Sequence, residues 1–513
     1  MRAMDALDVT LQPDACYLAL KARDARFDGR FFTGVTSTGI YCRPVCKVRT
    51  PRRENCRFFP HAAAAEGAGF RPCLRCRPEL APQSMVWSIQ DASGILAQQA
   101  ARLLDEPEAW GDTAPTVELL AQRLGVSDRH LRRIFESQFG VSPLQYLQTR
   151  RLLTAKQLLA DTDMPVTQVA LISGYASVRR FNAAFLDHYG LSPTQLRRQG
   201  TRATAGLQVR LGYRPPYDVA HMLGFFRTRR IAGIEFVGDT EVGRTLTIEH
   251  AGKVHNGWLV GRFDEDNHQV VLGVSDSLRE VLPLVIRRLR ASLDLDADPK
   301  AIHAVLGRDF PAGAGLRVPG TMSGYELAVR AVLGQQITVA AARTLARRLV
   351  DRFGEPIETP YPELTRLFPR AEVLAQAGGD ALGQLGIVKQ RQAAIVAIAR
   401  AVAGKRIALH SGADVPATIA ALKELPGIGD WTAHYIAMRA LRWPDAFPAG
   451  DVALQKALGV AKGPKAAREA EEASQAWKPW RSYAVIRAWD TLGGAAAATK
   501  TIAARAVPMR AGG

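Results

Sequence analysis

Four cysteines have a spacing that can hold a metal ion. They form two close pairs separated by 26 residues, and they are Cys42, Cys46, Cys73 and Cys76. Two pairs at this separation can close a tetrahedral site of four thiolates around one zinc ion. Judged from the spacing alone, a purely structural zinc site is the favoured interpretation. Cys16 and Cys56 fall outside the pattern and are expected to be ordinary cysteines.

Two features of this region favour a reactive zinc centre instead. Zinc with four thiolates carries a net charge of about −2, so its sulfurs are electron-rich and can attack an alkyl group. The surrounding sequence is also basic, with Glu54 as the single acid among Arg43, Lys47, Arg49, Arg52, Arg53 and Arg57. Such a charge is typical of contact with a phosphate backbone, and we expect Arg43 and Arg49 to contact DNA.

A second candidate site lies in the segment 425–433, which has the sequence LPGIGDWTA. It separates two helical patterns and is predicted to be the turn of a helix–hairpin–helix. Gly427 and Gly429 let the backbone approach a phosphate closely, so that amide groups and the next helix N-terminus can bind it. Asp451 lies 22 residues beyond Gly429 and is expected to cap the following helix. A capping carboxylate can also be catalytic, because the two roles are compatible.

The helices between these two sites form an internal repeat. A helix, a tight turn at Gly125 and a second helix recur around Gly174, 49 residues later. Both copies end in Gly-x-Ser-Pro, which disfavours two unrelated helical hairpins. The second helix of each copy is basic and is expected to read the major groove at two sites about one turn apart. The predicted DNA-contacting residues are Arg129, Arg132, Arg179 and Arg180.

The charge of the whole chain points to a polyanionic partner. Its 513 residues include 67 Lys and Arg against 49 Asp and Glu, which gives a formal net charge of +18. This excess suits nucleic acid or an anionic membrane surface. No stretch approaches the roughly 18 apolar residues that a membrane span needs, and acidic residues occupy the positions where a secretory signal would be apolar. We therefore expect a cytoplasmic, nucleoid-associated protein.

These patterns predict a multidomain, mainly α fold. Its units are a small zinc-bound α+β domain, an all-α tandem helix–turn–helix domain, an α+β subdomain with several strands, and an all-α helix–hairpin–helix domain. The expected boundaries are 1–82, 86–200, 207–318 and 319–495, with a disordered tail at 496–513. Alternating apolar residues predict strands at 207–211, 231–237, 244–248 and 270–274.

Three segments around the cysteines resemble the Ada family of adaptive-response proteins. They are TGIYCRPVC at 38–46, REN at 53–55 and GFRPCLRC at 69–76. In that family a zinc-bound cysteine of the Cys-Arg-Pro motif accepts a methyl group irreversibly from a DNA methylphosphotriester. The resemblance implies that Cys42 is the acceptor, a choice that spacing alone could not make. The repeat, with GYAS at 174–177, resembles the AraC-type DNA-binding domain that follows the zinc domain in Ada proteins.

The C-terminal half resembles AlkA, the 3-methyladenine DNA glycosylase II family. The resemblance covers about 207–492 and rests on PYD at 216–218, MLGF at 222–225, LGQ at 333–335, GIGDWTAHY at 427–435 and WKPWRSYA at 477–484. It implies that Asp451 is the catalytic carboxylate and that Trp431, Tyr435 and Trp489 form an aromatic pocket for a flipped, alkylated base. It also implies that the α+β subdomain at 207–318 has an antiparallel sheet and that this half needs no cofactor.

Three departures from these families limit the activity. No cysteine follows Cys76, so the alkylguanine methyltransferase that usually ends Ada proteins is absent. Glycosylases that also cut the strand have a lysine where this chain has Trp431, so a lyase is disfavoured. The leucine that fills the gap left by the flipped base is replaced by Gln336, followed by Ile337, and either residue could be this wedge. Gln336 is therefore included among the expected substrate-contacting residues.

We therefore expect a fusion of a methyl-accepting zinc domain, an AraC-type domain and a monofunctional alkylpurine glycosylase. The expected partners are alkylated and promoter double-stranded DNA, with RNA polymerase as a further candidate, and the chain is expected to be a monomer with one zinc ion. The alternative is a non-enzymatic transcription regulator with structural zinc and a decayed C-terminal half. Asp451, the glycine hairpin and the aromatic residues together disfavour that alternative.

Overall fold

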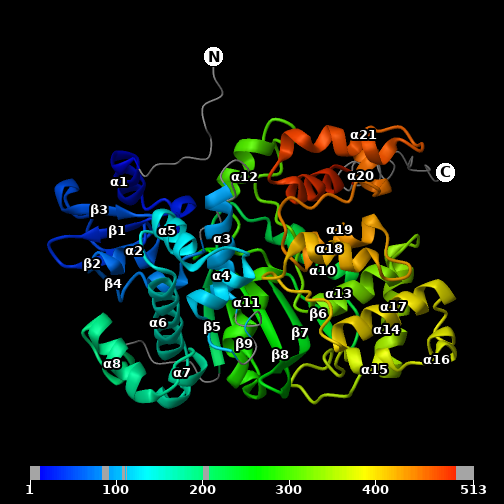
Figure 1. The fold of residues 1–513 in the computed structure, drawn as a ribbon, viewed down its shortest axis with the longest axis horizontal. Coiled ribbons are helices and arrows are strands. Elements are labelled where there is room, and N and C mark those ends of the chain that lie inside the picture. The colour runs from blue at the N-terminus through cyan, green and yellow to red at the C-terminus, as the bar shows by residue number, and fades with distance from the viewer. Residues whose placement is uncertain (1–11, 84–91, 107–109, 111–112, 200–206, 493–513) are drawn as a thin grey trace, which may run out of the picture.

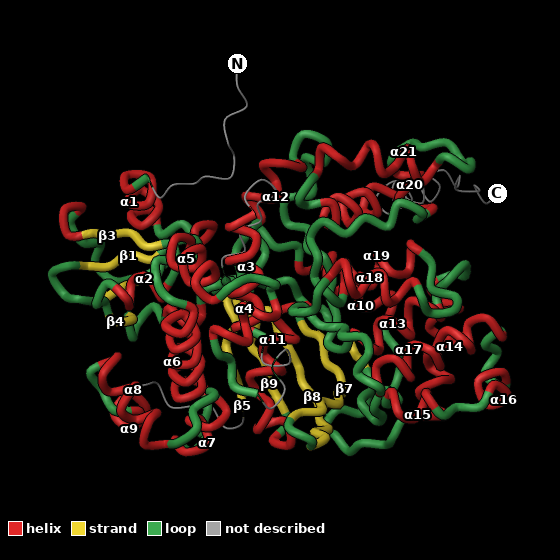
Figure 2. Tube along the Cα trace, viewed as in Figure 1, coloured by secondary structure: helices red, strands yellow, loops and turns green. Residues whose placement is uncertain are grey.

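The computed structural model describes residues 12–83, 92–106, 110, 113–199 and 207–492. The N-terminal units lie on one side of the molecule, the C-terminal helical domain lies on the other, and a five-stranded sheet stands between them (Figure 1). Among the described residues, strands are confined to the N-terminal domain and this central sheet (Figure 2). The expected tail at 496–513 and residues 200–206, at the boundary between the units expected at 86–200 and 207–318, lie outside the described residues. Within the described ranges, no helix combines the length and the apolar character that crossing a bilayer requires.

The N-terminal domain is a small sheet flanked by two helices. The sheet has the order β3-β1-β2-β4, in which β1 pairs antiparallel with β2 and β3, and β4 lies parallel to β2. Gly39, with a φ of 64°, makes the tight turn between β1 and β2. The elements are α1 (Pro13–Ala22), β1 (Phe32–Val35), β2 (Ile40–Cys42), β3 (Cys56–Phe59), α2 (Ala62–Gly67) and β4 (Arg71–Pro72).

The next unit is all-helical and contains the predicted repeat. Gly125 and Gly174 both have positive φ, at 67° and 85°, so each turn uses the conformation that glycine favours. The side chains of Ser127 and Ser177 cap the second helix of each copy, because each accepts a hydrogen bond from a backbone amide in the first turn of that helix. The helices are α3 (Ala92–Asp105), α4 (Val117–Arg123), α5 (Asp128–Phe139), α6 (Pro143–Asp161), α7 (Val166–Ile172), α8 (Val178–Tyr189) and α9 (Pro193–Gln199).

The central unit is an antiparallel sheet with the strand order β5-β9-β8-β7-β6. Helices α10 and α11 share one apolar core with these strands and the second helix–turn–helix. Helix α12 instead buries Ile302 and Leu306 in the core of the C-terminal helices. The elements are β5 (Leu207–Gly212), α10 (Val219–Arg229), β6 (Glu235–Val237), β7 (Glu241–His250), β8 (Lys253–Asp264), β9 (Gln269–Val274), α11 (Leu282–Ser292) and α12 (Pro299–Leu306).

The strand expected at 231–237 begins only at Glu235. Gly233 has a φ of 92°, which ends the extended conformation before that point. The long strand β8 was not expected from the sequence, because Gly257 and Gly261 interrupt its alternation of apolar and polar residues.

The last unit is helical, and its hairpin joins α18 to α19. A core of Leu, Ile, Val and Ala side chains from α13, α14, α17 and α19 holds this hairpin. The helices are α13 (Gly324–Leu333), α14 (Val339–Phe353), α15 (Ala371–Ala375), α16 (Gly379–Gly383), α17 (Lys389–Ala403), α18 (Val415–Lys423), α19 (Asp430–Arg439), α20 (Val452–Ala457) and α21 (Ala466–Ala473), followed by a helical stretch at 481–492.

The units pack directly on one another around Arg214. This side chain is completely buried, and its five N–H groups all donate to backbone carbonyls, at distances from 2.7 to 3.1 Å. The acceptors belong to Asp28 of the zinc domain, Pro82 and Gln83 of the connecting segment, and Asp296 and Ala297 of the central unit.

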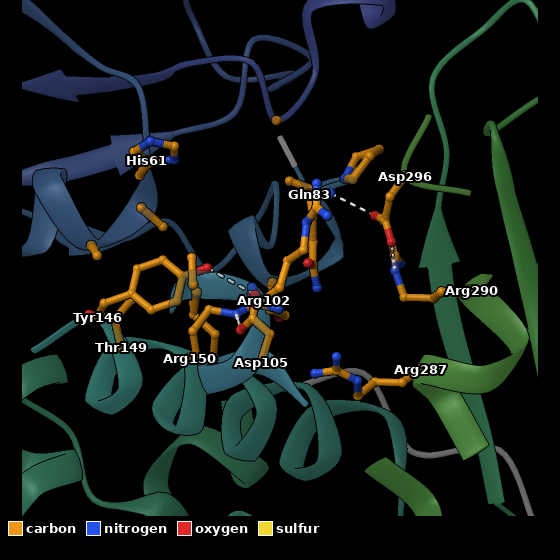
Figure 3. Close-up of a pocket in the computed structure, with 18 of the residues that line it drawn as sticks. His61, Gln83, Arg102, Asp105, Tyr146, Thr149, Arg150, Arg287, Arg290 and Asp296 are labelled. Carbon is orange, nitrogen blue, oxygen red and sulfur yellow. Dashed lines mark hydrogen bonds and ion pairs between the residues drawn. The ribbon is translucent and has the colours of Figure 1, made fainter. Parts of the chain in front are cut away.

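A cavity of about 190 Å³ lies beside this junction, with walls from all four units. Its charged lining is mutually paired: Arg150 donates to Asp105, and Arg290 donates to Asp296 (Figure 3). Because these charged side chains bind one another, the cavity is a feature of the interface between units.

Candidate functional site

The four cysteines predicted to bind zinc meet at one point of the N-terminal domain. Cys42 ends β2, and Cys73 directly follows β4, the parallel neighbour of β2. The amide of Cys73 donates to the carbonyl of Tyr41 at 2.9 Å, which brings the two cysteine pairs together. The four Sγ atoms of this cluster, which Cys46 and Cys76 complete, lie within 4.8 Å of one another.

This arrangement fits a four-thiolate zinc site. Zinc–sulfur bonds of about 2.3 Å in a tetrahedron place the sulfurs roughly 3.8 Å apart, so small shifts would close the site. Cys42, Cys46 and Cys73 are buried, which shields the site from competing ligands. Across the described residues, no other group of three or more His, Cys, Asp or Glu side chains has metal-binding geometry.

The two arginines expected to contact DNA here have different environments. Arg49 is exposed, as a backbone-contacting residue should be. The side chain of Arg43 is only 11% exposed, forms an ion pair with buried Asp28, and donates to the carbonyl of Cys76 at 3.0 Å. Burial lowers the pKa of Arg43, but the carboxylate of Asp28 outweighs burial and raises it. The expected DNA contact of Arg43 does not fit this placement, because Asp28 requires its charge inside the domain.

The arginines predicted on the repeated helices lie where DNA could reach them. Arg129 and Arg132 project from α5. Arg179 occupies in α8 the position that Arg129 has in α5, and Arg180 follows it in the first turn of α8. All four are exposed, although Arg132 also lies 4.0 Å from Glu118.

The hairpin between α18 and α19 has the geometry expected of a phosphate-binding turn. Gly427 has a φ of 75°, and Gly429 is the N-cap of α19 without a capping side chain, so the first amides of this helix stay available to a ligand. The side-chain amide of Gln335 donates to the carbonyl of Gly427 at 2.9 Å and to the hydroxyl of Thr432 at 3.0 Å. Gln335 thus fixes the hairpin to the end of α13, a role that we did not expect from its motif.

Asp451 lies at the N-terminus of α20 and combines two sets of contacts. Its Oδ1 accepts from the amide of Leu454 at 2.8 Å, which is the expected helix cap. Both indoles also donate to its carboxylate: Nε1 of Trp431 lies 2.9 Å from Oδ2, and Nε1 of Trp489 lies 3.1 Å from Oδ1. The carboxylate is therefore fixed by three donors and remains partly exposed among aromatic rings.

The third aromatic residue, Tyr435, stands beside this carboxylate site. The Trp431 and Tyr435 rings stack at 5.3 Å and 15°, and Trp489 lies 6.5 Å from Tyr435 at 43°. The structure thus brings Asp451 and the three predicted aromatic residues together. Such a wall of electron-rich rings can bind a cationic base, with each contact worth about 0.5–2 kcal/mol.

Two further residues at this site were not identified from the sequence. Arg439 donates to the hydroxyl of Tyr435 at 2.5 Å, and Arg229 of α10 faces the same hydroxyl. Burial raises the pKa of Tyr435, but the charges of Arg439 and Arg229 outweigh burial and hold that pKa below its usual value. Their role depends on contact between α10 and α19, which no short motif encodes.

The predicted wedge residues lie in the turn between α13 and α14. Gln336 is exposed and has a φ of 54°, an uncommon conformation for a residue with a side chain. Ile337 is half-buried. The structure thus presents Gln336 at the tip of the turn, beside the hairpin that Gln335 fixes.

Comparison with known families agrees with this division of the chain. Four family models match: the metal binding domain of Ada at residues 15–79, a helix-turn-helix domain at 120–199, the AlkA N-terminal domain at 208–323, and the HhH-GPD superfamily of base excision DNA repair proteins at 329–482. Fold and site therefore define a DNA glycosylase that is joined to a zinc-binding, DNA-binding regulator.

Known relatives extend over the whole chain. A protein of Mycobacterium tuberculosis, named "Probable bifunctional transcriptional activator/DNA repair enzyme AlkA", is 38% identical over 492 residues, which cover 93% of this chain and 96% of the relative. The chain belongs to this family of bifunctional transcriptional activators and DNA repair enzymes.

Relatives of each half are also found separately. The DNA-3-methyladenine glycosylase 2 of Escherichia coli is 32% identical over 55% of this chain and 97% of its own length. The bifunctional transcriptional activator/DNA repair enzyme Ada of the same organism is 33% identical over 37% of this chain and 50% of its own length.

Proposed function

We propose that the C-terminal half excises alkylated purines, such as 3-methyladenine and 7-methylguanine, by hydrolysis of the N-glycosidic bond. The observation that carries this proposal is the carboxylate of Asp451, held between the indoles of Trp431 and Trp489 beside a phosphate-binding hairpin. The resemblance to the E. coli glycosylase supports the same substrate class.

The reaction requires the protein mainly to position the damaged nucleotide and to supply negative charge. An alkylated purine is positively charged and leaves as a neutral base, so it needs no strong general acid. The enzyme has to flip the nucleotide out of the duplex and stabilise the positive charge that develops on the sugar. Asp451 supplies that negative charge, and water then adds to C1′. Because Trp431 occupies the position of the lyase lysine, the enzyme leaves the strand intact, and it uses no cofactor for this step.

The zinc domain is proposed to repair methylphosphotriesters stoichiometrically. A bound zinc ion keeps the four sulfurs as thiolates near neutral pH. The sulfur of Cys42 attacks the methyl carbon, the C–O bond breaks, and its electron pair stays on the phosphate oxygen as an ordinary diester. Exposed cations such as Arg49 would hold the DNA backbone during transfer.

The tandem helix–turn–helix is proposed to direct the protein to promoters. Exposed arginines on α5 and α8 are suited to two neighbouring major-groove sites, and one chain supplies both recognition helices, so it can act as a monomer. RNA polymerase is the further partner that transcription activation requires. These DNA-directed roles support a location at the nucleoid.

The test of the glycosylase is base release from alkylated duplex DNA by the wild type and by Asp451→Asn. Asparagine can still cap α20, but its NH2 group replaces one carboxylate oxygen and cannot accept from an indole, and its side chain carries no charge. We expect a loss of at least about 10²-fold in the single-turnover rate with DNA binding retained. Full activity in the variant would remove Asp451 from its role.

The test of methyl transfer uses DNA that carries labelled methylphosphotriesters. One label per chain should appear on Cys42 in peptide mapping, and Cys42→Ala should abolish transfer while leaving base release unchanged. Absence of both activities in the wild type would favour the non-enzymatic regulator instead.

A further inference from the structure

The hydroxyl of Tyr435 is surrounded by positive charge. Arg439 donates to its oxygen at 2.5 Å, and Arg229 approaches the same oxygen from α10. A phenol group can accept hydrogen bonds and donate one. Among the described residues, no acceptor for the O–H of Tyr435 is found within hydrogen-bond distance. The O–H group is thus available to donate to an acceptor atom of a ligand.

The arginine that meets this hydroxyl is firmly fixed. Arg439 is 6% exposed and donates to the carbonyls of Pro319 at 2.8 Å and Gly320 at 3.0 Å. Its guanidinium lies 4.8 Å from the ring of Phe225 and 5.3 Å from the ring of Tyr435. These contacts prevent Arg439 from turning away, so its charge polarises the phenol permanently.

The arrangement of the rings leaves an approach to this donor. Trp431 covers one face of Tyr435, whereas Trp489 stands 6.5 Å away. A base that lies between two rings needs a ring separation of about 7 Å, which is twice the contact distance of about 3.5 Å. A small widening of the gap between Tyr435 and Trp489 therefore admits a base. Because Trp489 is tilted by 43° relative to Tyr435, a base lying flat on Trp489 is oblique to the Tyr435 ring and not stacked on it.

We propose that Tyr435 donates its O–H to an acceptor atom on the edge of the flipped base, and that Arg439 positions and polarises this donor. Tyr435 and Arg439 together then determine whether the enzyme prefers neutral or cationic damaged bases. The proposal rests on the proposed glycosylase function and adds a determinant of specificity to it.

The sign of the effect depends on the charge of the base. When the C1′–N bond of a neutral base breaks, the bonding pair stays on the base, and negative charge spreads to its acceptor atoms. The hydrogen bond from Tyr435 stabilises that charge, while water adds to C1′ and its proton ends on the departed base, so Tyr435 keeps its own proton. A cationic base leaves as a neutral molecule, so the hydrogen bond from Tyr435 does not stabilise its departure. The positive charges of Arg439 and Arg229 also oppose its binding.

The test is Tyr435→Phe, which removes only the hydroxyl. Single-turnover excision is measured on two duplexes that differ in one lesion: hypoxanthine, which is neutral, and 7-methylguanine, which is cationic. Loss of one preorganised donor should slow hypoxanthine release by about 10²-fold and leave 7-methylguanine release nearly unchanged. Arg229→Gln should shift the ratio in favour of 7-methylguanine, because it removes one opposing charge and keeps Tyr435 itself in place.

Tyr483→Phe is the matched control. Its hydroxyl donates to Asp294 at 3.2 Å away from the aromatic pocket, so this variant should leave the ratio of the two rates unchanged. An equal fall for both lesions in Tyr435→Phe would overturn the role of Tyr435 while leaving the glycosylase intact. Failure of the wild type to release either base would instead overturn the proposed function.

Discussion

Arg43 and Arg49 lie six residues apart beside the zinc cluster and have opposite roles. Arg43 neutralises buried Asp28, whose side chain is 4% exposed, whereas Arg49 faces solvent. Removing one partner of a buried ion pair leaves the other charge uncompensated, and this costs about 3–5 kcal/mol. Removing an exposed cation costs the fold little but removes one phosphate contact.

The first prediction follows from this difference. Arg49→Gln should leave thermal stability unchanged and should lower the slope of log Kd for duplex DNA against log salt by about 1. Arg43→Gln should instead lower the melting temperature and speed loss of zinc to a chelator. Fluorescence anisotropy across a salt series and calorimetry measure the two effects. If both variants weakened DNA binding equally at unchanged stability, the burial of Arg43 would not describe its role.

The second prediction concerns Trp431, which occupies the position of the lyase lysine. An indole cannot form a Schiff base, because its N–H is not a nucleophilic amine, and here it donates to Asp451. Borohydride should therefore trap no covalent adduct between protein and alkylated DNA during base release. A lyase assayed in parallel provides the positive control, and any trapped adduct of this chain would reveal an amine that the site does not show.

The residues of the site differ in how far motifs could identify them. Cys42 and Asp451 belong to short local motifs, so the resemblance of those motifs to known families could single them out. Arg439 sits in the same helix as Trp431, yet its function depends on Phe225 and Pro319, which lie far away in the chain. Such contacts exist only after folding, and no spacing rule reports them.

At the scale of elements, helix α2 links the zinc domain to the DNA-binding repeat. Its Glu66 is buried and accepts from the hydroxyl of Tyr41 at 2.8 Å, from Thr149 of α6 at 2.6 Å, and from His188 of α8 at 2.5 Å. One carboxylate thus joins the strand that carries Cys42 to the second recognition helix.

The third prediction tests this link through pH. Burial lowers the pKa of His188, but Glu66, with help from Asp187, outweighs burial and raises that pKa. The ion pair therefore stabilises the fold fully below about pH 6.5, the ordinary value for His, and is lost as pH rises through the raised pKa. Glu66→Gln should cost about 1–3 kcal/mol at pH 6 and less at pH 8.

Calorimetry at the two pH values measures this difference. Glu472→Gln is the control, because Glu472 is exposed and its ion pair with Arg468 contributes little. An equal loss at both pH values would show that the charge of His188 does not contribute to the link.

Elements were predictable where their pattern was regular. The glycine turns and the repeated Gly-x-Ser-Pro predicted both helix–turn–helix copies, and the structure adds a serine cap and a positive φ at each turn. Strand β8 pairs with β7 over ten residues, yet its own sequence lacks the alternation that marks a strand. Its neighbours determine its conformation, so it could be found only in the assembled sheet.

At the scale of the whole molecule, the zinc domain is held against the central unit. All N–H donors of Arg214 form hydrogen bonds at this junction, and Arg30 of the zinc domain forms an ion pair with Asp298 at 3.1 Å. No sequence motif predicted this packing, because none of these residues stands out in its own segment of the sequence. The consequence is that a change of charge at the zinc cluster acts at a fixed distance from the rest of the DNA-binding surface.

We expect that charge to be the physical basis of a switch. Four thiolates on one zinc ion leave a net negative charge facing the phosphates of DNA. Two like unit charges about 4 Å apart cost about 1 kcal/mol in water and about 4 kcal/mol at an effective dielectric of 20. A methyl group on Cys42 turns one thiolate into a neutral thioether and removes one negative charge. Exposed cations such as Arg49 then meet the phosphates with less opposition.

The last prediction is that methylation tightens promoter binding. Incubation with methylphosphotriester DNA should lower the promoter Kd at low salt by about five-fold, which corresponds to about 1 kcal/mol. The gain should shrink as salt rises, because screening weakens the repulsion being relieved. Anisotropy with promoter DNA measures it, and Cys42→Ala should lose the gain while keeping the basal binding of α5 and α8. A methyl group mapped to another cysteine, or unchanged affinity at low salt after stoichiometric transfer, would leave the zinc with a structural role alone.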